Sequence, residues 1–324
     1  MTKPSVPTFL VAGAGRSGTT GLVEGLRTHP RVFVTQPKEP HYFALHGQQA
    51  DFRGPGDAAT INRVAVTDRD RYLDLFPAEH DFLALGDGSV STLYYASRAI
   101  DEIRRINPQM RLVVILRDPV ARAYSSYLYM RSRGFEPCED VLEALADEPR
   151  RREQNWHHLW HYETMSHYAA DLATLQQALG RDRVGVWFHD DLVADYAGTV
   201  SSVLRFLGLP PDPAEGVDVP RVNVSGTPRL PVVQNAIVAA TRNELLRHTV
   251  KRMTSFRLRE RIRRSSLRPS SVPVEVQRHF EGIFDADRVA LTSLVSGRVP
   301  DWLRDALPMR RGAAAEGGDR DTGQ

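Results

Sequence analysis

A glycine-rich run near the N-terminus combines a flexible backbone with one cation and three hydroxyls. It spans Gly13 to Thr20 (GAGRSGTT) and follows the apolar segment Thr8 to Ala12. Glycines let the backbone close around an anion without a clash from Cβ. Amide groups at the start of a helix point toward such an anion, together with the positive end of the helix dipole. The pattern therefore predicts a phosphate-binding loop between a strand and a helix that starts near Thr19.

The position of the cation separates two nucleotide chemistries. A nucleoside triphosphatase loop reads GxxxxGK[ST]; here Gly13 and Gly18 keep the spacing, but Thr19 replaces the lysine. Without that lysine, the loop lacks a contact to the β- and γ-phosphates of ATP. A cation at Arg16, two residues before the last glycine, suits a single 5′-phosphate and a group that leaves from it. This departure counts against an ATP-dependent phosphotransferase.

A second cation follows the clearest buried strand in the sequence. Leu112 to Leu116 (LVVIL) is continuously apolar, and Arg117 comes directly after it. Open α/β sheets bind ligands at the carboxyl ends of their strands. Arg117 is therefore expected at the same edge of the sheet as the first loop. Ser125 lies further on, in a helix that Pro119 is suited to begin. The alternative is that Arg117 pairs with a neighbouring carboxylate and Ser125 merely lies on a helix surface.

These two segments resemble those of the sulfotransferases that use 3′-phosphoadenosine-5′-phosphosulfate (PAPS). Arg16 to Thr20 (RSGTT) is similar to the family's 5′-phosphosulfate loop, in which most members have lysine at the place of Arg16. Leu116 to Tyr127 (LRDPVARAYSSY) is similar to the family's 3′-phosphate motif, LRDPxxRxxSxY. The resemblance implies that Arg117 and Ser125 bind the 3′-phosphate. It implies a 5′-phosphosulfate loop made of Gly15, Arg16, Ser17, Gly18, Thr19 and Thr20, in which Arg16 also stabilises charge on the leaving oxygen.

A carboxylate and a histidine follow a short predicted strand at Val32 to Val34. Pro37 to Phe43 (PKEPHYF) resembles the E-x-H-F-F segment of the heparan sulfate-type sulfotransferases. The resemblance implies that Glu39 is the general base that deprotonates the acceptor hydroxyl, with His41 as a supporting residue. Such proton removal typically contributes ~10²–10⁴-fold to the rate. Two alternatives remain: His41 is itself the base, as in the cytosolic sulfotransferases, or Glu39 is a surface carboxylate paired with Lys38.

Two further segments resemble family loops, with departures. Gly86 to Tyr94 (GDGSVSTLY) is similar to G-E-x-[ST]-P-x-Y-L, but it has Asp87 for the glutamate and lacks the proline. Gly88 stands where the heparan sulfate subgroup has a lysine that helps bind donor and acceptor, so that contact is not implied here. Asn223 to Arg229 (NVSGTPR) resembles the C-terminal loop that covers the nucleotide. Its candidate lid contacts are Gly226, Thr227 and Arg229.

The segments that must position these residues alternate between strands and helices. The pattern adds strands at Phe82–Leu85 and Val184–Phe188, and helices at Ala96–Ile106, Tyr168–Leu179, Val200–Leu207 and Val274–Val295. Such alternation is typical of a parallel sheet covered by helices on both faces. We expect an α/β fold, a three-layer sandwich like that of the P-loop NTPases. A single domain is predicted over residues 1–308, followed by a disordered tail at 309–324.

Composition limits the class of protein. The 324 residues are 41% hydrophobic and 25% charged, which is enough apolar material for a full core, and the net charge of +2 does not favour nucleic acid as a partner. Cys138 is the single cysteine, so neither an internal disulfide nor a cysteine-based zinc site is expected. The sequence shows no signal peptide and no apolar run near ~20 residues, which predicts a cytoplasmic protein. Residues 245–264 are strongly basic. This pattern predicts either a solvated segment or a segment that contacts an acidic acceptor or a membrane surface.

The sequence as a whole predicts a sulfotransferase that moves a sulfuryl group from PAPS to a hydroxyl. The acceptor is a glycan, a lipid or a small molecule, and no metal is needed. Neither nucleic acid nor a transmembrane segment is expected, although weak peripheral contact with a membrane fits the basic segment. Two alternatives stay open: an ATP-dependent phosphotransferase and a non-catalytic nucleotide-binding protein.

Overall fold

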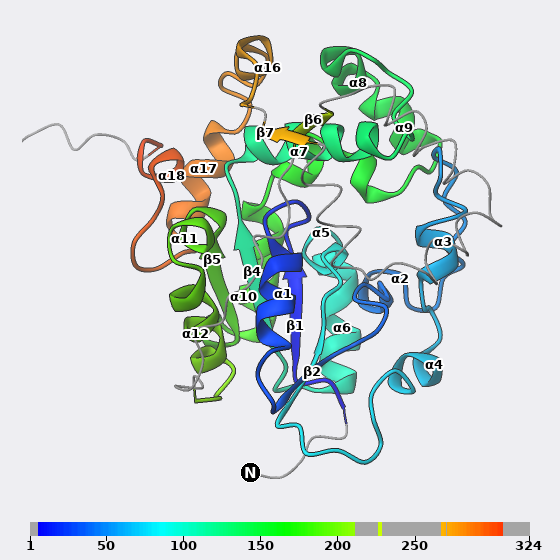
Figure 1. Cartoon of the computed structure of the whole chain (residues 1–324), viewed down its shortest axis with the longest axis vertical. Coiled ribbons are helices and arrows are strands. Elements are labelled where there is room, and N and C mark those ends of the chain that lie inside the picture. The colour runs from blue at the N-terminus through cyan, green and yellow to red at the C-terminus, as the bar shows by residue number, and fades with distance from the viewer. Residues whose placement is uncertain (1–5, 211–225, 229–266, 270, 307–324) are drawn as a thin grey trace, which may run out of the picture.

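A parallel sheet of five strands forms the centre of the computed structural model, which describes residues 6–210, 226–228, 267–269 and 271–306 (Figure 1). The strand order is β2-β3-β1-β4-β5, and every neighbouring pair is parallel. β1 therefore lies between β3 and β4, so the loops that follow these three strands emerge at the same edge. The strands are β1 (Phe9–Gly13), β2 (Val32–Val34), β3 (Ala84–Asp87), β4 (Arg111–Leu116) and β5 (Val184–Phe188).

Helices cover both faces of this sheet. α1 (Thr19–Leu26) and α12 (Tyr196–Phe206) pack on one face, and α6 (Ala96–Ile106) and α10 (Ala169–Leu179) pack on the other. Side chains of β4 alternate between the two apolar clusters: Leu112, Val114 and Leu116 enter one, and Val113 and Ile115 enter the other. A strand buried on both faces must be apolar at every position, which explains the continuous LVVIL run. The predicted α/β sandwich is confirmed.

A third group of elements lies beyond the carboxyl ends of the strands (Figure 1). It contains α7 (Pro119–Ser132), α8 (Val141–Ala146) and α9 (Glu148–Glu153). α7 and α8 pack with α16 (Val274–His279) around an apolar cluster of their own. A short antiparallel pair, β6 (Gly226–Pro228) with β7 (Leu267–Pro269), lies against α7. The remaining helices are α2 (Tyr42–Leu45), α3 (Ile61–Val64), α4 (Arg69–Leu73), α5 (Ser91–Tyr94), α11 (His189–Ala194), α17 (Asp285–Thr292) and α18 (Asp301–Arg304), with 3₁₀ turns at His158–Trp160, Thr164–Ser166 and Arg181–Arg183.

Most predicted boundaries agree with the structure to within one residue, and three differ by more. The third strand is Ala84–Asp87 rather than Phe82–Leu85, because its register is set by pairing with β1 and β2. α12 begins at Tyr196 rather than Val200, since the Asp195 carboxylate caps it by accepting from the amide of Gly198. The helical pattern at 274–295 is divided into α16 and α17. Gly282 adopts a φ of 76° between them, which a right-handed helix cannot contain.

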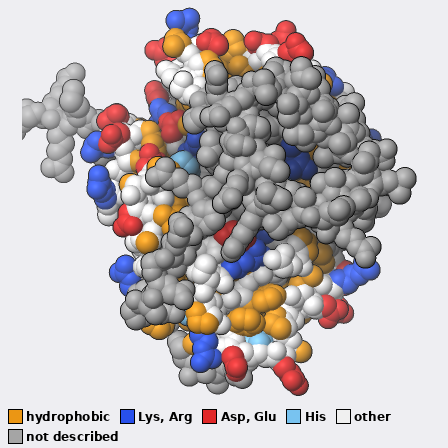
Figure 2. Space-filling view, in the orientation of Figure 1, with side chains coloured by type: hydrophobic (Ala, Val, Ile, Leu, Met, Phe, Trp, Pro, Cys, Tyr) orange, Lys and Arg blue, Asp and Glu red, His pale blue; other side chains and the backbone are white. Residues whose placement is uncertain are grey.

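Surface charge on the face shown in Figure 2 is mixed. Acidic and basic side chains occur near one another around its edge, while hydrophobic side chains gather below the centre of the view. Within the described part of the chain, no helix is long and apolar enough to cross a membrane. Arg229, the basic residues 245–264 and the predicted tail at 309–324 lie outside the described residues.

Candidate active site

The loops after β1 and β4 meet at one edge of the sheet. The Arg117 guanidinium, directly after β4, donates from Nη1 to the carbonyl oxygen of Arg16 at 3.1 Å. The amide of Ala14 donates to the carbonyl of Ile115 in β4 at 2.8 Å, which holds the start of the first loop against the same strand. The two predicted anion-binding segments, about 100 residues apart in sequence, are therefore in direct contact.

The backbone of the first loop turns sharply before α1. Arg16 and Gly18 have φ angles of 71° and 96°, and Gly18 is the residue that caps the helix. A Cβ at Gly18 would lie 2.7 Å from Cδ2 of Leu192, so the turn requires glycine for space as well as for φ. The Ser17 side chain is buried, and its Oγ has no hydrogen-bond partner among the described residues. Such a hydroxyl at a helix start fits an oxygen of a bound phosphate.

An aromatic ring of α7 holds the Arg16 side chain. The guanidinium carbon lies 4.4 Å from the centre of the Tyr129 ring, within the range of a cation–π contact. Ser125 is buried on the same helix, one turn before Tyr129, and residues four apart share a helix face. The face of α7 that contacts the first loop is therefore the face that carries Ser125.

Arg117 is partly buried, and no carboxylate of the described residues forms an ion pair with it. Burial lowers the pKa of its guanidinium. The adjacent Asp118 is occupied elsewhere, because it caps α7 through the amide of Ala121 and pairs with Arg288 at 3.1 Å. A desolvated guanidinium of this kind suits a phosphate. The alternative in which Arg117 only pairs with a neighbouring carboxylate therefore lacks its partner among these residues.

Glu39 lies beside Lys38 and His41, beyond β2. Its Oε1 is 2.6 Å from Nζ of Lys38, its Oε2 is 3.9 Å from Nε2 of His41, and its side chain is 28% exposed. Burial by itself would raise the pKa of this carboxyl, but Lys38 and His41, with a smaller effect of Arg16, outweigh it, so the pKa lies below its ordinary value. The carboxylate is therefore ionised at neutral pH. The predicted pair with Lys38 exists, yet the same carboxylate also faces His41.

His41 is held in place through its backbone amide and through one nitrogen of its ring. It is buried, its amide donates to Oγ of Ser89 at 2.9 Å, and its Nδ1 is 2.9 Å from Oγ of Ser91. Burial lowers the pKa of the imidazole; Glu39 acts in the opposite direction but is outweighed by burial together with the smaller effect of Lys38. The ring is therefore neutral at pH 7, with Nε2 directed at the side of Glu39.

A buried carboxylate fixes the segment that holds His41. Oδ1 of Asp87 accepts from the amide and the hydroxyl of Ser89 at 2.7 and 2.6 Å, and Oδ2 accepts from the Tyr72 hydroxyl at 3.1 Å. Burial raises the pKa of Asp87 to about 6. This residue replaces the glutamate that the family motif has, and its hydrogen bonds reach His41 through Ser89.

Lys38 fills the space over Gly88. Its Nζ donates to the carbonyl oxygen of Gly88 at 3.2 Å, and its own carbonyl accepts from the Gly88 amide at 3.1 Å. A Cβ at position 88 would lie 2.9 Å from Cγ of Lys38, too close for an unchanged neighbour. Position 88, where the heparan sulfate subgroup has a lysine, is glycine here. The ammonium group of Lys38, from another segment, lies near this position and next to Glu39.

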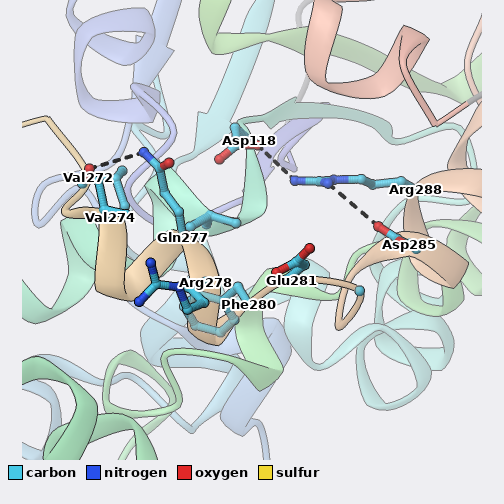
Figure 3. A pocket seen from close by; sticks show the side chains of 11 residues that line it. Asp118, Val272, Val274, Gln277, Arg278, Phe280, Glu281, Asp285 and Arg288 are labelled. Carbon is cyan, nitrogen blue, oxygen red and sulfur yellow. Dashed lines mark hydrogen bonds and ion pairs between the residues drawn. The ribbon is translucent and has the colours of Figure 1, made fainter.

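Two cavities lie near this edge of the sheet. One, of about 330 Å³, is lined by Lys38, Glu39 and His41 together with parts of segments 59–64, 129–135 and 157–159. The other, of about 610 Å³, lies between the start of α7 and helices α16 and α17; there Arg288 lies between Asp118 and Asp285 (Figure 3). The larger cavity contains none of the predicted site residues, so the smaller one is the candidate site for an acceptor.

The family model of the Sulfotransferase family matches residues 7–213, more than half of the chain. The chain belongs to the Sulfotransferase family. The match covers the first loop, Glu39, His41, Arg117 and Ser125. The family membership predicted from the sequence is confirmed.

Two relatives show how far the sulfotransferase similarity extends. Over 181 residues the chain is 30% identical to carbohydrate sulfotransferase 15 of Mus musculus, covering 44% of this chain and 30% of that protein. Over 208 residues it is 26% identical to heparan sulfate glucosamine 3-O-sulfotransferase 3B1 of Homo sapiens, covering 63% and 46%. The chain therefore spans less than half the length of these two relatives.

One solved structure shares the fold over nearly its whole length. The sulfotransferase from Alicyclobacillus acidocaldarius superimposes with a TM-score of 0.69 at 23% identity, covering 91% of this chain and 98% of that one. The likeness shows that the two proteins share the parallel sheet and its helical layers.

The structure brings together most of the predicted sulfotransferase site but not all of it. Residues 15–20, Arg117 and Ser125 lie around the loop after β1, and Glu39 with His41 lies beside it. The backbone of Gly226 and Thr227 forms part of β6, against α7, whereas Arg229 lies outside the described residues.

Sequence reasoning missed three side chains of this region. Tyr129 carries a detectable signal, since it lies one helical turn beyond Ser125. For Lys38 the sequence predicts only a pair with Glu39, as one of the alternatives, whereas the side chain also fills the space over Gly88. The third, His158, lines the cavity beside Glu39 and comes from a segment about 120 residues away that gave no periodic signal.

Proposed function

We propose that this chain transfers a sulfuryl group from PAPS to an acceptor hydroxyl, with Glu39 as the general base. Membership of the Sulfotransferase family supports the reaction class. The observation that carries the donor is the contact between Arg117 and the carbonyl of Arg16, at 3.1 Å. Two groups suited to phosphate lie close enough for one nucleotide with a 3′-phosphate and a 5′-phosphosulfate to reach both.

The proposed reaction is an in-line transfer. Amides of residues 17–20 hold the 5′-phosphate at the positive end of α1, while Arg117 and Ser125 hold the 3′-phosphate. The acceptor oxygen bonds to sulfur as the bond from sulfur to the bridging oxygen breaks, and the nucleotide leaves with the electron pair. Arg16 stabilises the negative charge that grows on that oxygen. Glu39 accepts the proton of the hydroxyl.

Glu39 is a better candidate for the base than His41. Its carboxylate is ionised and partly exposed, so it is ready to accept a proton from a group in the neighbouring cavity. His41 is 5% exposed, its Nδ1 is engaged by Ser91, and its Nε2 faces Glu39. We therefore assign His41 the task of orienting the carboxylate. The acceptor class (glycan, lipid or small molecule) and the cytoplasmic location stay predictions.

Titration with the spent donor, 3′-phosphoadenosine-5′-phosphate (PAP), tests the proposal. We expect the native protein to bind PAP, and Arg117→Ala to bind it at least about 10²-fold more weakly, because a charge-assisted contact to phosphate is lost. Arg205→Ala removes an exposed arginine of α12 and is expected to bind PAP normally. Binding of Mg-ATP without PAP would favour the phosphotransferase. PAP binding with no transfer from PAPS to any hydroxyl would favour the non-catalytic binder.

A further inference from the structure

Two adjacent histidines beside the smaller cavity have opposite environments. Both His157 and His158 are buried. Nδ1 of His157 accepts from the amide of Leu159 at 2.9 Å, and its Nε2 is 3.3 Å from Oδ1 of Asp57. The carboxylate of Asp57 also accepts from the His157 amide at 3.1 Å. Both ring nitrogens of His157 therefore have partners within the fold.

The ring of His158 is not used in this way. Its side chain is 1% exposed, and neither Nδ1 nor Nε2 has a hydrogen-bond partner among the described residues. Its neighbours are rings that contact it through their faces or edges: His41 at 5.6 Å and Tyr95 at 5.7 Å between ring centres. A buried polar ring without partners is costly, so its presence in a native structure calls for a ligand or another specific reason.

His158 lines the same cavity as Glu39 and His41. Burial, with smaller effects of His157 and His41, places the pKa of His158 well below its ordinary value, so the ring is neutral. A neutral imidazole offers one N–H donor and one acceptor nitrogen. It therefore matches a hydroxyl, which also both donates and accepts.

The volume and the other lining residues of the cavity indicate which kind of molecule would fit. Its volume of about 330 Å³ is at the small end for ligand sites. Apolar side chains line much of it, among them Ile61, Met130, Phe135 and Leu159. A compact molecule with an apolar face and more than one polar group is complementary to this wall.

We infer that this cavity is the acceptor site and that His158 hydrogen-bonds a polar group of a compact hydroxylated acceptor whose reacting hydroxyl faces Glu39. The inference rests on the proposed function, and it adds the size and chemistry of the acceptor and a residue that recognises it. His158 contributes to binding and orientation, while proton removal stays with Glu39.

A pair of matched variants separates recognition from structure. His158→Phe keeps an aromatic ring but removes both nitrogens, and His157→Phe makes the same change one residue earlier. Because the ring nitrogens of His158 have no hydrogen-bond partner to lose in the described part of the chain, His158→Phe is expected to melt at the native temperature or above it. His157→Phe is expected to melt lower, since Asp57 and the amide of Leu159 lose their partner. Both are followed by thermal unfolding and by PAP titration.

Activity is measured as PAP release from PAPS with four compact probes: 4-nitrophenol, 2-naphthol, methyl β-D-glucoside and N-acetylglucosamine. We expect the native protein to sulfate at least one of them. For that probe, His158→Phe should lower kcat/KM by about 10–10³-fold, mainly through KM, with PAP affinity unchanged. His158→Gln, which keeps a donor and an acceptor, should recover part of the loss.

Three results would overturn the inference. The first is an unchanged kcat/KM in His158→Phe. The second is a lower melting temperature together with weaker PAP binding in that variant, which would assign His158 a structural role. The third is a native protein that binds PAP but sulfates none of the four probes; this rejects the compact acceptor and leaves the proposed function standing. A native protein that fails to bind PAP rejects the proposed function itself.

Discussion

The two halves of the proposed site are built in different ways. The donor half consists of residues 13–20 and Arg117, which directly follow β1 and β4, with Ser125 on the next helix. The acceptor half combines side chains from separate segments: Glu39 after β2, Ser89 and Ser91 after β3, and His158 far along the chain. Anion sites made from backbone and strand ends depend on local geometry. A pocket made from side chains depends on how distant segments pack.

The electrostatics of the halves differ as well. Arg117 is a desolvated cation that meets no carboxylate of the described residues, so it favours an anionic ligand. Glu39 is a carboxylate beside the cations Lys38 and Arg16, and the histidines near it, His41 and His158, are neutral. The donor half is therefore expected to determine nucleotide affinity, and the acceptor half to determine proton removal and acceptor choice. Variants of Glu39, Arg16 and Lys38 test this division, and a variant of Asp87 tests the buried carboxylate that supports the acceptor half.

The largest effect is expected from Glu39→Gln. Removal of the base should lower kcat by about 10²–10⁴-fold, while PAP affinity stays within about twofold of native because no donor contact is changed. Turnover is measured with the best of the four hydroxyl probes, and affinity is measured by calorimetry. Glu153→Gln, an exposed change in α9, serves as the control. Near-normal turnover would reject the base assignment, and a large loss of PAP affinity would break the division.

Arg16→Ala should lower kcat by at least about 10²-fold with the fold intact, because the leaving oxygen loses its stabilising charge. The contact with the Tyr129 ring is also lost, at a cost in stability of about 0.5–1 kcal/mol. Tyr129→Phe keeps the ring and is expected to retain near-native turnover. Near-native turnover in Arg16→Ala would reject this role of the cation, and an equal loss in Tyr129→Phe would mean that the reaction needs the tyrosine hydroxyl as well.

Asp87→Asn should change how stability depends on pH. The pKa of Asp87 is about 6 in the folded protein, above the ordinary value of 3.8. The protonated carboxyl therefore makes its full contribution to stability below pH 3.8, and this contribution is lost as the pH rises through about 6. The shift corresponds to about 3 kcal/mol. Asparagine does not titrate, so the native-minus-variant difference in unfolding free energy should fall between pH 4 and pH 7. Urea denaturation at several pH values measures it; a constant difference would contradict the raised pKa.

The smallest effect is expected from Lys38→Met. Lys38 is the largest influence that lowers the pKa of Glu39, so its removal should raise that pKa. Because the base must be deprotonated, the acid limb of the kcat/KM profile should move to higher pH, while rates at high pH converge. Lys38→Arg keeps the charge and should leave the limb in place. An unmoved limb in Lys38→Met would indicate that the titrating base is a different group.

Helices and strands of the central layers were predictable because their patterns are local. Val184–Phe188 and Ala96–Ile106 have the predicted bounds, since one is an apolar run between turns and the other an amphipathic segment stopped before Pro108. The pattern at 274–295 predicted one helix, which is wrong. The apolar spacing continues through Gly282, where the chain turns. The strand at 84–87 shifted because pairing with β1 and β2, rather than its own composition, defines its ends.

The sequence alone determined the family, the sheet with its two helical layers and the loop after β1, because each depends on residues that are neighbours along the chain. Tertiary structure alone decided that Arg117 meets that loop, that Lys38 occupies the space over Gly88, and that His158 lies buried beside Glu39. These contacts join segments 50 to 120 residues apart. Their geometry follows from strand order and from packing at the sheet edge, neither of which any short segment encodes.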